Sequence, residues 1–251
     1  MFPVLIFFVG GFVLEKNPFK YIRAENYGNF SDPVPAWPEF TPVNLINHYI
    51  LRLLREDPKD FIAFSRCWRD AYSELYGGII DDILHPEYYH RLFGHRETFL
   101  KGFYSAFVFE DNKSGAIFGG SLTFLDFTNR AAQAVLLAVS PSYRHTYDVG
   151  KFLYLYSEQY DRFLEATGIE YAWSAVVANH RVTQKMLKHI GYKVRGVVPG
   201  MGISAINTVY YRRDNYVYMD KFYNQGSKRV PVKMDLIPEA EKIWKVSEGE
   251  E

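Results

Sequence analysis

Apolar residues recur three and four positions apart in several stretches of the chain, a spacing that predicts amphipathic helices. The first stretch ends at the pair Gly77-Gly78, and the second begins at Pro86, a residue suited to a first helical turn. Gly168 ends the third. The helices predicted in this way cover residues 57–76, 86–100, 151–166, 181–189 and 238–246.

Shorter apolar runs between these helices predict strands. They cover residues 48–55, 106–110, 116–126, 131–139, 171–178, 192–198 and 216–222. The polar turn DNKSG joins the second and third runs and predicts a hairpin. Ala131–Val139 (AAQAVLLAV) is apolar on both faces, so we expect a central strand covered by helices on each side. This order of elements predicts an α/β protein with one mixed sheet under helices.

The N-terminus needs separate treatment, because residues 2–14 are apolar almost throughout. The run is too short to span a bilayer. It also lacks the preceding basic residues and the small-residue cleavage site of a secretory signal. We therefore predict two short strands instead, over 4–9 and 12–15, on either side of a glycine turn.

Four prolines within residues 31–42 favour an extended strap, because proline breaks a helix. We therefore predict an N-terminal extension, residues 1–47, that packs on the core or on a partner in a homodimer. The main domain is predicted over 48–222 and a charged tail over 223–251.

Composition narrows the class of protein. The 29 Lys and Arg residues balance 29 Asp and Glu residues, so no net positive charge favours nucleic acid or anionic membrane as a partner. The single cysteine, Cys67, cannot form an intramolecular disulfide and fits a reducing cytoplasm. His85, His90 and His95 recur every five residues, a spacing that scatters them around a helix, so we predict no metal site.

The segment with the clearest chemical potential is Leu137–Gly150, LAVSPSYRHTYDVG, where a buried strand turns directly into a helix. The first N–H groups of such a helix have no backbone partner, and together with the helix dipole they attract phosphate. Arg144 and Lys151 flank the turn and add positive charge. The alternative is an ordinary strand-to-helix connection, since every α/β protein contains such junctions.

Three motifs together resemble the Gcn5-related N-acetyltransferase (GNAT) family. Residues 141–144 (PSYR), followed by 148–151 (DVGK) and an amphipathic helix, resemble its pyrophosphate loop. Residues 178–192 (ANHRVTQKMLKHIGY) resemble its next segment, and the strand with Arg52 before Glu56-Asp57 resembles its opening. In order, these motifs span residues 48–222.

The resemblance implies an acyltransferase fold and acyl-CoA as the donor, without a metal. The backbone of residues 137–139 would pair with the pantetheine amides, and the N–H groups of 144–150 would hold the pyrophosphate. The residues that the resemblance assigns to the cofactor are Leu137, Ala138, Val139, Arg144, His145, Thr146, Tyr147, Asp148, Val149, Gly150, Lys151 and Asn179. The resemblance implies N-acetyltransferase activity. A primary amine would take the acetyl group from acetyl-CoA by direct attack in a ternary complex.

The sequence departs from the family pattern at several positions. Tyr147 and Val149 stand where the loop has glycines, and only a one-residue insertion brings Gly150 into place. Leu187 stands where many relatives have a tyrosine that protonates the leaving thiolate. His180 takes the position of the family's asparagine, so that segment is also one residue longer.

These departures leave the catalytic groups open. The titratable or hydroxyl groups nearest the expected cleft are Tyr147, Tyr192, His145 and His180, each of which also suits a structural role. Tyr147 and Tyr192 are the candidates for protonating the thiolate. The alternative function is a non-catalytic acyl-CoA-binding or interaction protein on the same fold, and the sequence leaves the acyl chain length open.

Overall fold

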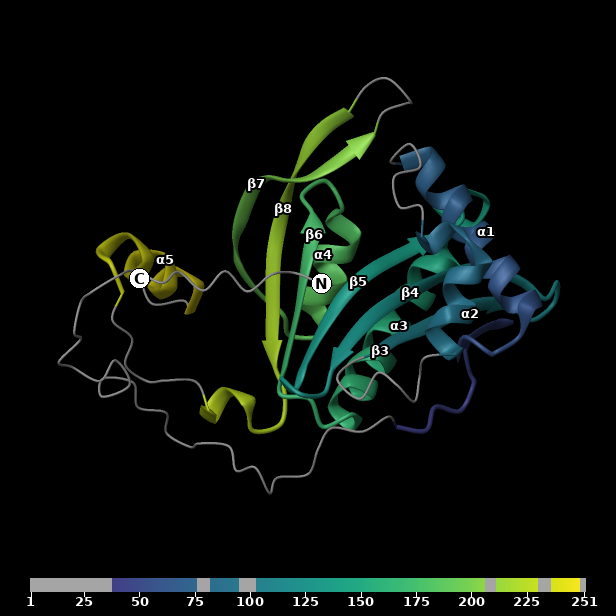
Figure 1. The fold of residues 1–251 in the computed structure, drawn as a ribbon, viewed down its shortest axis with the longest axis horizontal. Coiled ribbons are helices and arrows are strands. Elements are labelled where there is room, and N and C mark those ends of the chain that lie inside the picture. The colour runs from purple at the N-terminus through teal and green to yellow at the C-terminus, as the bar shows by residue number, and fades with distance from the viewer. Residues whose placement is uncertain (1–37, 76–81, 95–102, 206–210, 230–235, 249–251) are drawn as a thin grey trace.

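The computed structural model describes residues 38–75, 82–94, 103–205, 211–229 and 236–248. These residues form a mixed α/β structure built on one eight-stranded sheet (Figure 1). The strands are β1 (Val43–Ile46), β2 (Tyr49–Leu53), β3 (Phe103–Asp111), β4 (Ala116–Asp126), β5 (Ala131–Val139), β6 (Tyr171–Val177), β7 (Lys193–Ala205) and β8 (Tyr211–Phe222). Their spatial order is β1-β2-β3-β4-β5-β6-β8-β7. The fold class predicted from the hydrophobic pattern is confirmed.

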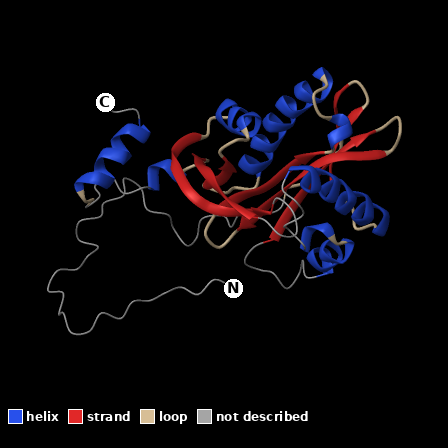
Figure 2. Ribbon diagram, turned by 90° about the horizontal axis from the view of Figure 1, so that it is seen from above, coloured by secondary structure: helices blue, strands red, loops and turns tan. Residues whose placement is uncertain are grey.

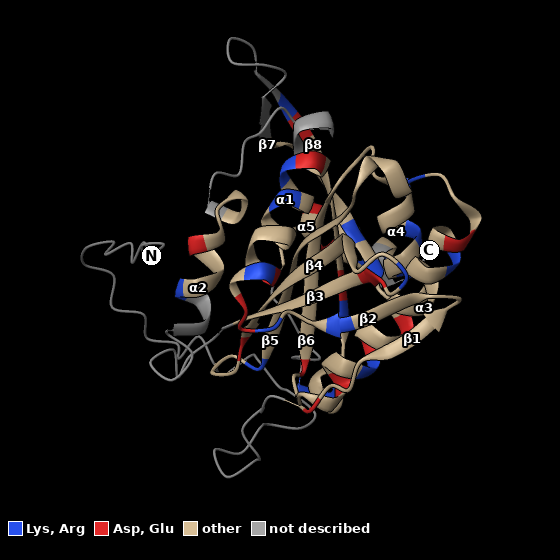
Figure 3. Ribbon diagram, turned by 90° about the vertical axis from the view of Figure 1, so that its right-hand side faces the viewer, with Lys and Arg blue, Asp and Glu red and all other residues tan. Residues whose placement is uncertain are grey.

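Helices cover both faces of the sheet (Figure 2). The α-helices are α1 (Pro58–Leu75), α2 (Pro86–Gly94), α3 (Tyr147–Ala166), α4 (Arg181–His189) and α5 (Pro238–Glu248). The short 3₁₀ helices are η2 (Asp82–Leu84), η3 (Pro141–Tyr143) and η4 (Gly226–Arg229). Figure 3 shows α1 and α2 on one side of the sheet and α3 and α4 on the other. None of the helices in these ranges is long and apolar enough to cross a membrane.

Several predicted elements agree closely with the structure, and others do not. β5 and α4 have the predicted bounds, whereas α3 begins at Tyr147 rather than at residue 151. The short strand β1 was not predicted; it pairs with β2 and lies inside the predicted extension. The strands expected over 4–9 and 12–15, and the end of the helix expected over 86–100, lie outside the described residues.

The face under α1 and α2 is closely packed. Phe64 and Trp68 of α1 are fully buried against the sheet together with Leu122 and Val108. A Cβ atom at Gly120 of β4 would lie 2.2 Å from Cε2 of Phe64, so the absence of a side chain there lets the helix approach. This contact sets the distance between α1 and the sheet.

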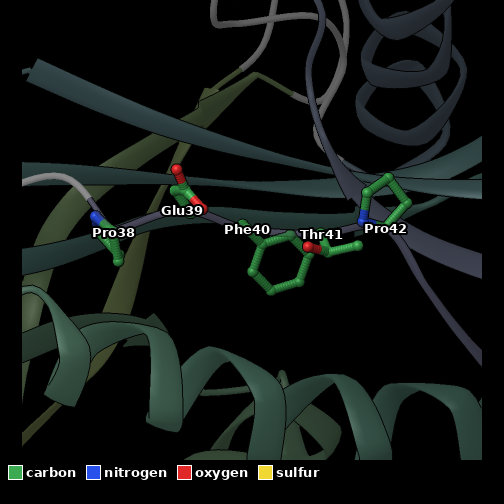
Figure 4. Close-up of a pocket in the computed structure, with 5 residues that line it drawn as sticks. All are labelled: Pro38, Glu39, Phe40, Thr41 and Pro42. Atoms are coloured by element: carbon green, nitrogen blue, oxygen red, sulfur yellow. The ribbon is translucent and has the colours of Figure 1, made fainter.

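The opposite face holds the larger aromatic core. α3 lays Phe152, Tyr156 and Phe163 against the sheet, and α4 adds Met186 and Leu187. Phe40 joins this core from the strap before β1, with its ring centroid 4.9 Å from that of Phe107. A hollow of about 460 Å³ lies along residues 38–42, and Figure 4 shows the Phe40 ring turned toward the helix beneath. The end of the strap is therefore anchored on the core.

A buried ion network fixes α1 to the strands. Arg52 of β2 is 3% exposed, and its Nη1 and Nη2 donate to the carboxylate of Asp60 at 2.6 and 3.0 Å. Its Nε donates to Glu110 of β3 at 2.5 Å. Arg52, which lies in the strand that resembles the family's opening segment, thus joins β2, α1 and β3. On the outer surface of α1, basic and acidic residues are interspersed (Figure 3).

Candidate functional site

The two central strands separate from each other along their length. β5 and β6 run parallel, but they pair only from Ala131–Ala134 to Tyr171–Ser174. Beyond that point β5 continues along β4 to Val139, and β6 continues along β8 to Val177. Figure 1 shows the two strands starting side by side and diverging toward their arrowheads. The facing backbone edges in the opened part therefore do not pair with each other.

A β-bulge starts this divergence. Leu122 of β4 pairs with Leu136 and Thr123 pairs with Ala134, so Val135 is the extra residue of β5. Val135 and the next residue, Leu136, both pack on the side of α1, which an unbroken strand would not allow. Such bulges bend a strand and increase its twist. At the last shared rung, Ser174 Oγ donates to the carbonyl oxygen of Ala134 at 3.1 Å.

The opened end of β5 leads through η3 into α3. Thr146 caps the helix, because its Oγ1 accepts from the backbone N–H of Val149 at 3.3 Å. In this described segment, the backbone N–H groups of Tyr147 and Asp148 donate to no protein acceptor. A Cβ atom added to Gly150 would meet nothing within 4 Å. The helix start therefore offers open donors and free space, as an anion site requires.

The left-handed backbone conformation that a glycine would favour occurs in this loop at His145, not at Tyr147. His145 has a φ of 67°, in the left-handed region, whereas Tyr147 already lies in the helix. Histidine is among the residues that adopt this conformation more often than most side chains do. Tyr147 is 82% exposed, so its ring is accommodated in solvent. The loop therefore needs no glycine at 147.

The charges around the helix start differ from the predicted arrangement. Arg144 folds back onto the protein, since its Nε donates to the carbonyl oxygen of Val139 at 2.8 Å and its Nη2 to that of Ala71 at 3.3 Å. Lys151 is exposed on the first turns of α3. Asp148 places a carboxylate in the first turn, where it accepts from Nδ2 of Asn47 at 2.9 Å. Backbone donors thus predominate over fixed cations here.

The segment after β6 forms the other side of the opening. Ala178 N–H donates to Asn215 of β8, and His180 N–H donates to the carbonyl oxygen of Val177, each at 2.8 Å. Asn179 is exposed, as a ligand-binding residue would be, and His180 is half-buried. Burial and the positive charge of Arg144 lower the pKa of His180 below its ordinary value.

The structure does not bring the two candidate tyrosines together. Tyr147 lies at the start of α3, whereas Tyr192 is 2% exposed in the core, near Tyr160 farther along that helix. Burial and the neighbouring tyrosines raise the pKa of Tyr192 well above its ordinary value. Leu187 is also buried in this core. The placement of Tyr192 argues against proton transfer to a ligand at the opened strand ends.

Sequence reasoning missed an aromatic patch on the opposite face of β6 and β8. Ala172 and Val176 point into the α3 core, so the alternating residues Tyr171 and Trp173 point to the other side. Trp173 stacks on Tyr218 at a ring-centroid distance of 5.4 Å. Tyr171 donates to Asp220, which also accepts from Nε of Arg195 at 2.7 Å. The patch begins at the rung where Trp173 pairs with Gln133, beside the divergence.

Two comparisons of the sequence give no match. No protein-family model matches this sequence, and no curated protein does. Within the described residues, no group of three His, Cys, Asp or Glu side chains could hold a metal ion.

Comparison with solved structures gives many matches. Ribosomal-protein-S5-alanine acetyltransferase from Vibrio fischeri matches 73% of this chain and 97% of its own, with a TM-score of 0.57 and 14% identity. The match to a GNAT superfamily phosphinothricin acetyltransferase from Sinorhizobium meliloti, in complex with AcCoA, covers 76% of this chain and 97% of the other, with a TM-score of 0.52 and 18% identity. The match to spermidine N-acetyltransferase from Vibrio cholerae, in complex with CoA and spermine, covers 72% of this chain and 98% of the other, with a TM-score of 0.50 and 12% identity. The chain therefore has the fold of the Gcn5-related N-acetyltransferase superfamily.

Proposed function

We propose that this protein is an acyl-CoA-dependent N-acyltransferase that moves acetyl from acetyl-CoA to a primary amine by direct attack in a ternary complex. The observation that carries the proposal is the divergence of β5 from β6 at the Val135 bulge, next to a capped helix start with open N–H groups. Together these features offer backbone partners for a long amide-containing arm and donors for its phosphates.

The donor would lie along the opened edge of β5. Backbone groups of Leu137, Ala138 and Val139 would pair with the pantetheine amides, although the Val139 carbonyl oxygen already accepts from Arg144. The N–H groups of Tyr147 and Asp148 would meet the pyrophosphate, and the exposed Asn179 would contact the arm from the other side. Bound acyl-CoA supplies an activated thioester, and the protein fixes it in near-attack geometry.

The acceptor would approach from the face that carries the aromatic patch, because α3 and α4 cover the other face of the sheet. Of the two tyrosines considered for protonating the departing thiolate, Tyr147 is exposed, but it lies at the helix start assigned to the pyrophosphate, at the other end of the cofactor arm. CoA thiolate is a good leaving group near neutral pH, so turnover does not depend on that proton.

We further propose a reducing cytoplasm as the location, because the single cysteine, Cys67, is a buried free thiol.

A non-catalytic acyl-CoA-binding protein is the second candidate. Leu187, at the position of the family's acid tyrosine, is buried in the α3 core and carries no proton to donate. A longer acyl chain as the transferred group is a third possibility, which the half-buried rings of the aromatic patch would favour.

Calorimetry and a thiol-release assay separate these functions. CoA and acetyl-CoA should bind and raise the melting temperature. At a hundredfold excess of ligand over Kd, binding should add about 2.7 kcal/mol to the free energy of unfolding. Gly150→Val should weaken this binding by filling the open position at the helix start. Gly196→Val is the matched control, because a Cβ atom at this β7 position also meets nothing within 4 Å.

Each outcome has a defined meaning. No thermal shift at millimolar CoA would reject an acyl-CoA protein of either kind. Tight binding without thiol release across a broad panel of amines would favour the binding protein. Turnover with longer thioesters but not with acetyl-CoA would favour the longer acyl group.

A further inference from the structure

The aromatic patch of β6 and β8 continues across the sheet toward α2. Tyr104 of β3 pairs with Phe124 of β4, and their ring centroids lie 5.3 Å apart. Phe124 pairs in turn with Gln133 of β5, which pairs with Trp173, and Trp173 stacks on Tyr218. Partners in neighbouring strands point to the same face of a sheet. Because Tyr104 packs on the side of α1 and α2, these five residues form one aromatic row on that side.

The aromatic row lies beside the place where the thioester of acyl-CoA would be held. Gln133 and Trp173 form the rung next to Ala134 and Ser174, the last rung that β5 and β6 share. The cofactor arm would run from the helix start along the opened edges and end at this rung, because the strands are paired beyond it. The row is therefore at the acyl end of the arm, opposite to the helix start assigned to the pyrophosphate.

The other face of the sheet is filled at this rung. Ala134 packs in the core under α3, and Ser174 is buried with its Oγ donating to the carbonyl oxygen of Ala134. On the neighbouring strand, Thr123 is 1% exposed, and its Oγ1 donates to the hydroxyl of Tyr160 at 3.2 Å. An acceptor that reaches the thioester across a face of the sheet must therefore come over the aromatic row.

The aromatic row is a flat apolar surface with one polar group in it. Phe124 and Trp173 lie on either side of Gln133, and all three side chains are half-buried. Among the residues that the structure describes, the Gln133 amide has no hydrogen-bond partner. Aromatic rings prefer offset-stacked or edge-to-face contacts, so a planar group covers such a surface well. A polar substituent on that group would meet the Gln133 amide.

The carboxylates on this side of the sheet already hold donors. Asp220 is 6% exposed and accepts from Nε of Arg195 at 2.7 Å and from the hydroxyl of Tyr171 at 3.2 Å. Asp126, at the end of β4, accepts from the backbone N–H and from Nδ2 of Asn129 in its own turn, at 3.0 and 2.6 Å. A second ammonium group would therefore gain little from either residue, which argues against a polyamine as the acceptor.

We propose that the acceptor in the acetyl transfer proposed above is a primary amine carried on an aromatic group, which stacks on the aromatic row beside Trp173. The inference rests on the proposed function, because it names the class of acceptor for that reaction. The ring of the acceptor replaces water on Phe124 and Trp173, and its amine points to the rung of Ala134 and Ser174, where the thioester would lie. The row thus sets which amine is used.

The transfer itself balances without another reagent. The amine lone pair forms the C–N bond, the C–S bond breaks, and the thiolate leaves with its electron pair. The nitrogen loses a proton to solvent and the thiolate gains one from solvent, so that amine and acetyl-CoA yield amide and CoA thiol. An alkyl acyl chain matches the row less well than an aromatic acceptor, because it is not planar and has no polar atom for Gln133.

Four primary amines test the acceptor class on the full chain with acetyl-CoA. Phenethylamine carries a planar ring, cyclohexylethylamine a puckered ring of similar size, butylamine no ring, and spermidine further ammonium groups. An aromatic contact contributes up to about tenfold beyond the burial of its area. The kcat/KM for phenethylamine should therefore exceed that for cyclohexylethylamine by about tenfold, and those for butylamine and spermidine by more.

Trp173→Leu tests the row itself, with Tyr154→Leu as the matched control. Tyr154 is an exposed residue of α3, on the other side of the sheet, and its ring contacts that of His189. Trp173→Leu should lower kcat/KM for phenethylamine by about tenfold, mainly through KM. Butylamine turnover and the thermal shift given by CoA should stay as in wild type. Tyr154→Leu should behave as wild type with every amine.

Two further variants guard against a loss of folding. Trp173→Phe keeps a ring and should retain most of the preference for phenethylamine. Phe124→Leu removes the ring on the other side of Gln133, so it should weaken the same preference even if Trp173→Leu does not fold.

Several results would overturn the aromatic acceptor. Butylamine or spermidine used as well as phenethylamine by wild type is one. A folded Trp173→Leu variant that keeps the wild-type preference is another, and so is one that uses all four amines less well to the same extent, because that result indicates a structural role. A variant impaired only with longer thioesters would assign the row to the acyl chain instead.

Failure of the wider proposal looks different. Wild-type protein that binds no CoA, or that binds CoA but releases thiol with no amine, would reject the proposed function and the acceptor site with it. Transfer to every amine without preference would reject the acceptor class and leave the transferase standing.

Discussion

Asn47 and Asp148 are 101 positions apart in the sequence, yet Nδ2 of Asn47 donates to Oδ2 of Asp148 at 2.9 Å. Asn47 lies in the tight turn between β1 and β2 with a φ of 51°, and Asp148 lies in the first turn of α3. The contact therefore ties the first hairpin of the sheet to the helix start that we propose as the phosphate site. A carboxylate there stabilises the helix dipole but repels a phosphate.

Asp148→Asn should separate these two effects. The variant should lose about 0.3–1 kcal/mol of unfolding free energy, because the favourable charge at the helix start is removed. It should also bind CoA more tightly than wild type, since the repulsion of the pyrophosphate is gone. Chemical denaturation and calorimetry measure the two quantities. Asn47→Ala, which keeps the carboxylate, serves as the control, and a tighter complex in that variant would speak against charge as the cause.

Thr146→Ala should destabilise the protein by about 1 kcal/mol, because it removes the side-chain acceptor for Val149 N–H at the start of α3. Thr146→Ser keeps the hydroxyl and should retain most of the stability. Urea denaturation of the three proteins checks this. Equal losses in the alanine and serine variants would show that the threonine methyl group, not the cap, matters here.

Two glycines should respond in opposite directions to alanine. Gly120→Ala should cost about 1–3 kcal/mol, since the new Cβ atom would lie 2.2 Å from Phe64 Cε2 and 2.5 Å from the carbonyl oxygen of Phe107. Gly150→Ala should stabilise α3 by about 0.8–1 kcal/mol, because that position is helical and open. Thermal unfolding in the absence of CoA gives both values. A destabilised Gly150→Ala variant would indicate that this helix start needs glycine.

Cys67 should be inert in the native protein. Its side chain is 3% exposed, and burial, followed by the charge of Asp70, raises the pKa of the thiol to about 12, so almost no thiolate is present near pH 8. A thiol reagent should therefore label the cysteine only after denaturant is added. Rapid labelling of native protein would show that α1 opens away from the sheet at low cost.

The sequence predicts those features that depend on neighbouring residues. β5 and α4 have clear periodicity and clear ends, and the strand-to-helix junction at Leu137–Gly150 was recognised from its local pattern. The divergence of β5 from β6 depends on the bulge at Val135, which arises from pairing with β4 and leaves no mark in a single sequence. The start of α3 was missed because Tyr147 and Asp148 break the apolar stripe, although Thr146 is a good N-cap residue.

In the candidate site, too, the sequence predicts what depends on neighbouring residues and misses what depends on how the chain folds. The resemblance placed Leu137–Val139 and Asn179 along the opening, and the structure puts them on its two sides. It could not show that Arg144 turns back to the Val139 carbonyl oxygen, because that bond depends on how the loop folds. Tyr192 was chosen by its nearness in sequence to the helix after β6, whereas its side chain points into the α3 core.

Arg52 tests how far the sheet depends on a single buried charge. The guanidinium holds Asp60 through two hydrogen bonds and Glu110 through a third, and the residue is 3% exposed. Arg52→Leu should cost about 3–5 kcal/mol, because it leaves two carboxylates near each other without their cation. Arg52→Leu combined with Asp60→Leu and Glu110→Leu should recover much of that loss, since desolvation of the unpaired carboxylates is its main cause. Denaturant unfolding measures each protein. If the triple variant is less stable than Arg52→Leu alone, the network stabilises the junction of β2, α1 and β3 by its geometry rather than by neutralising charge.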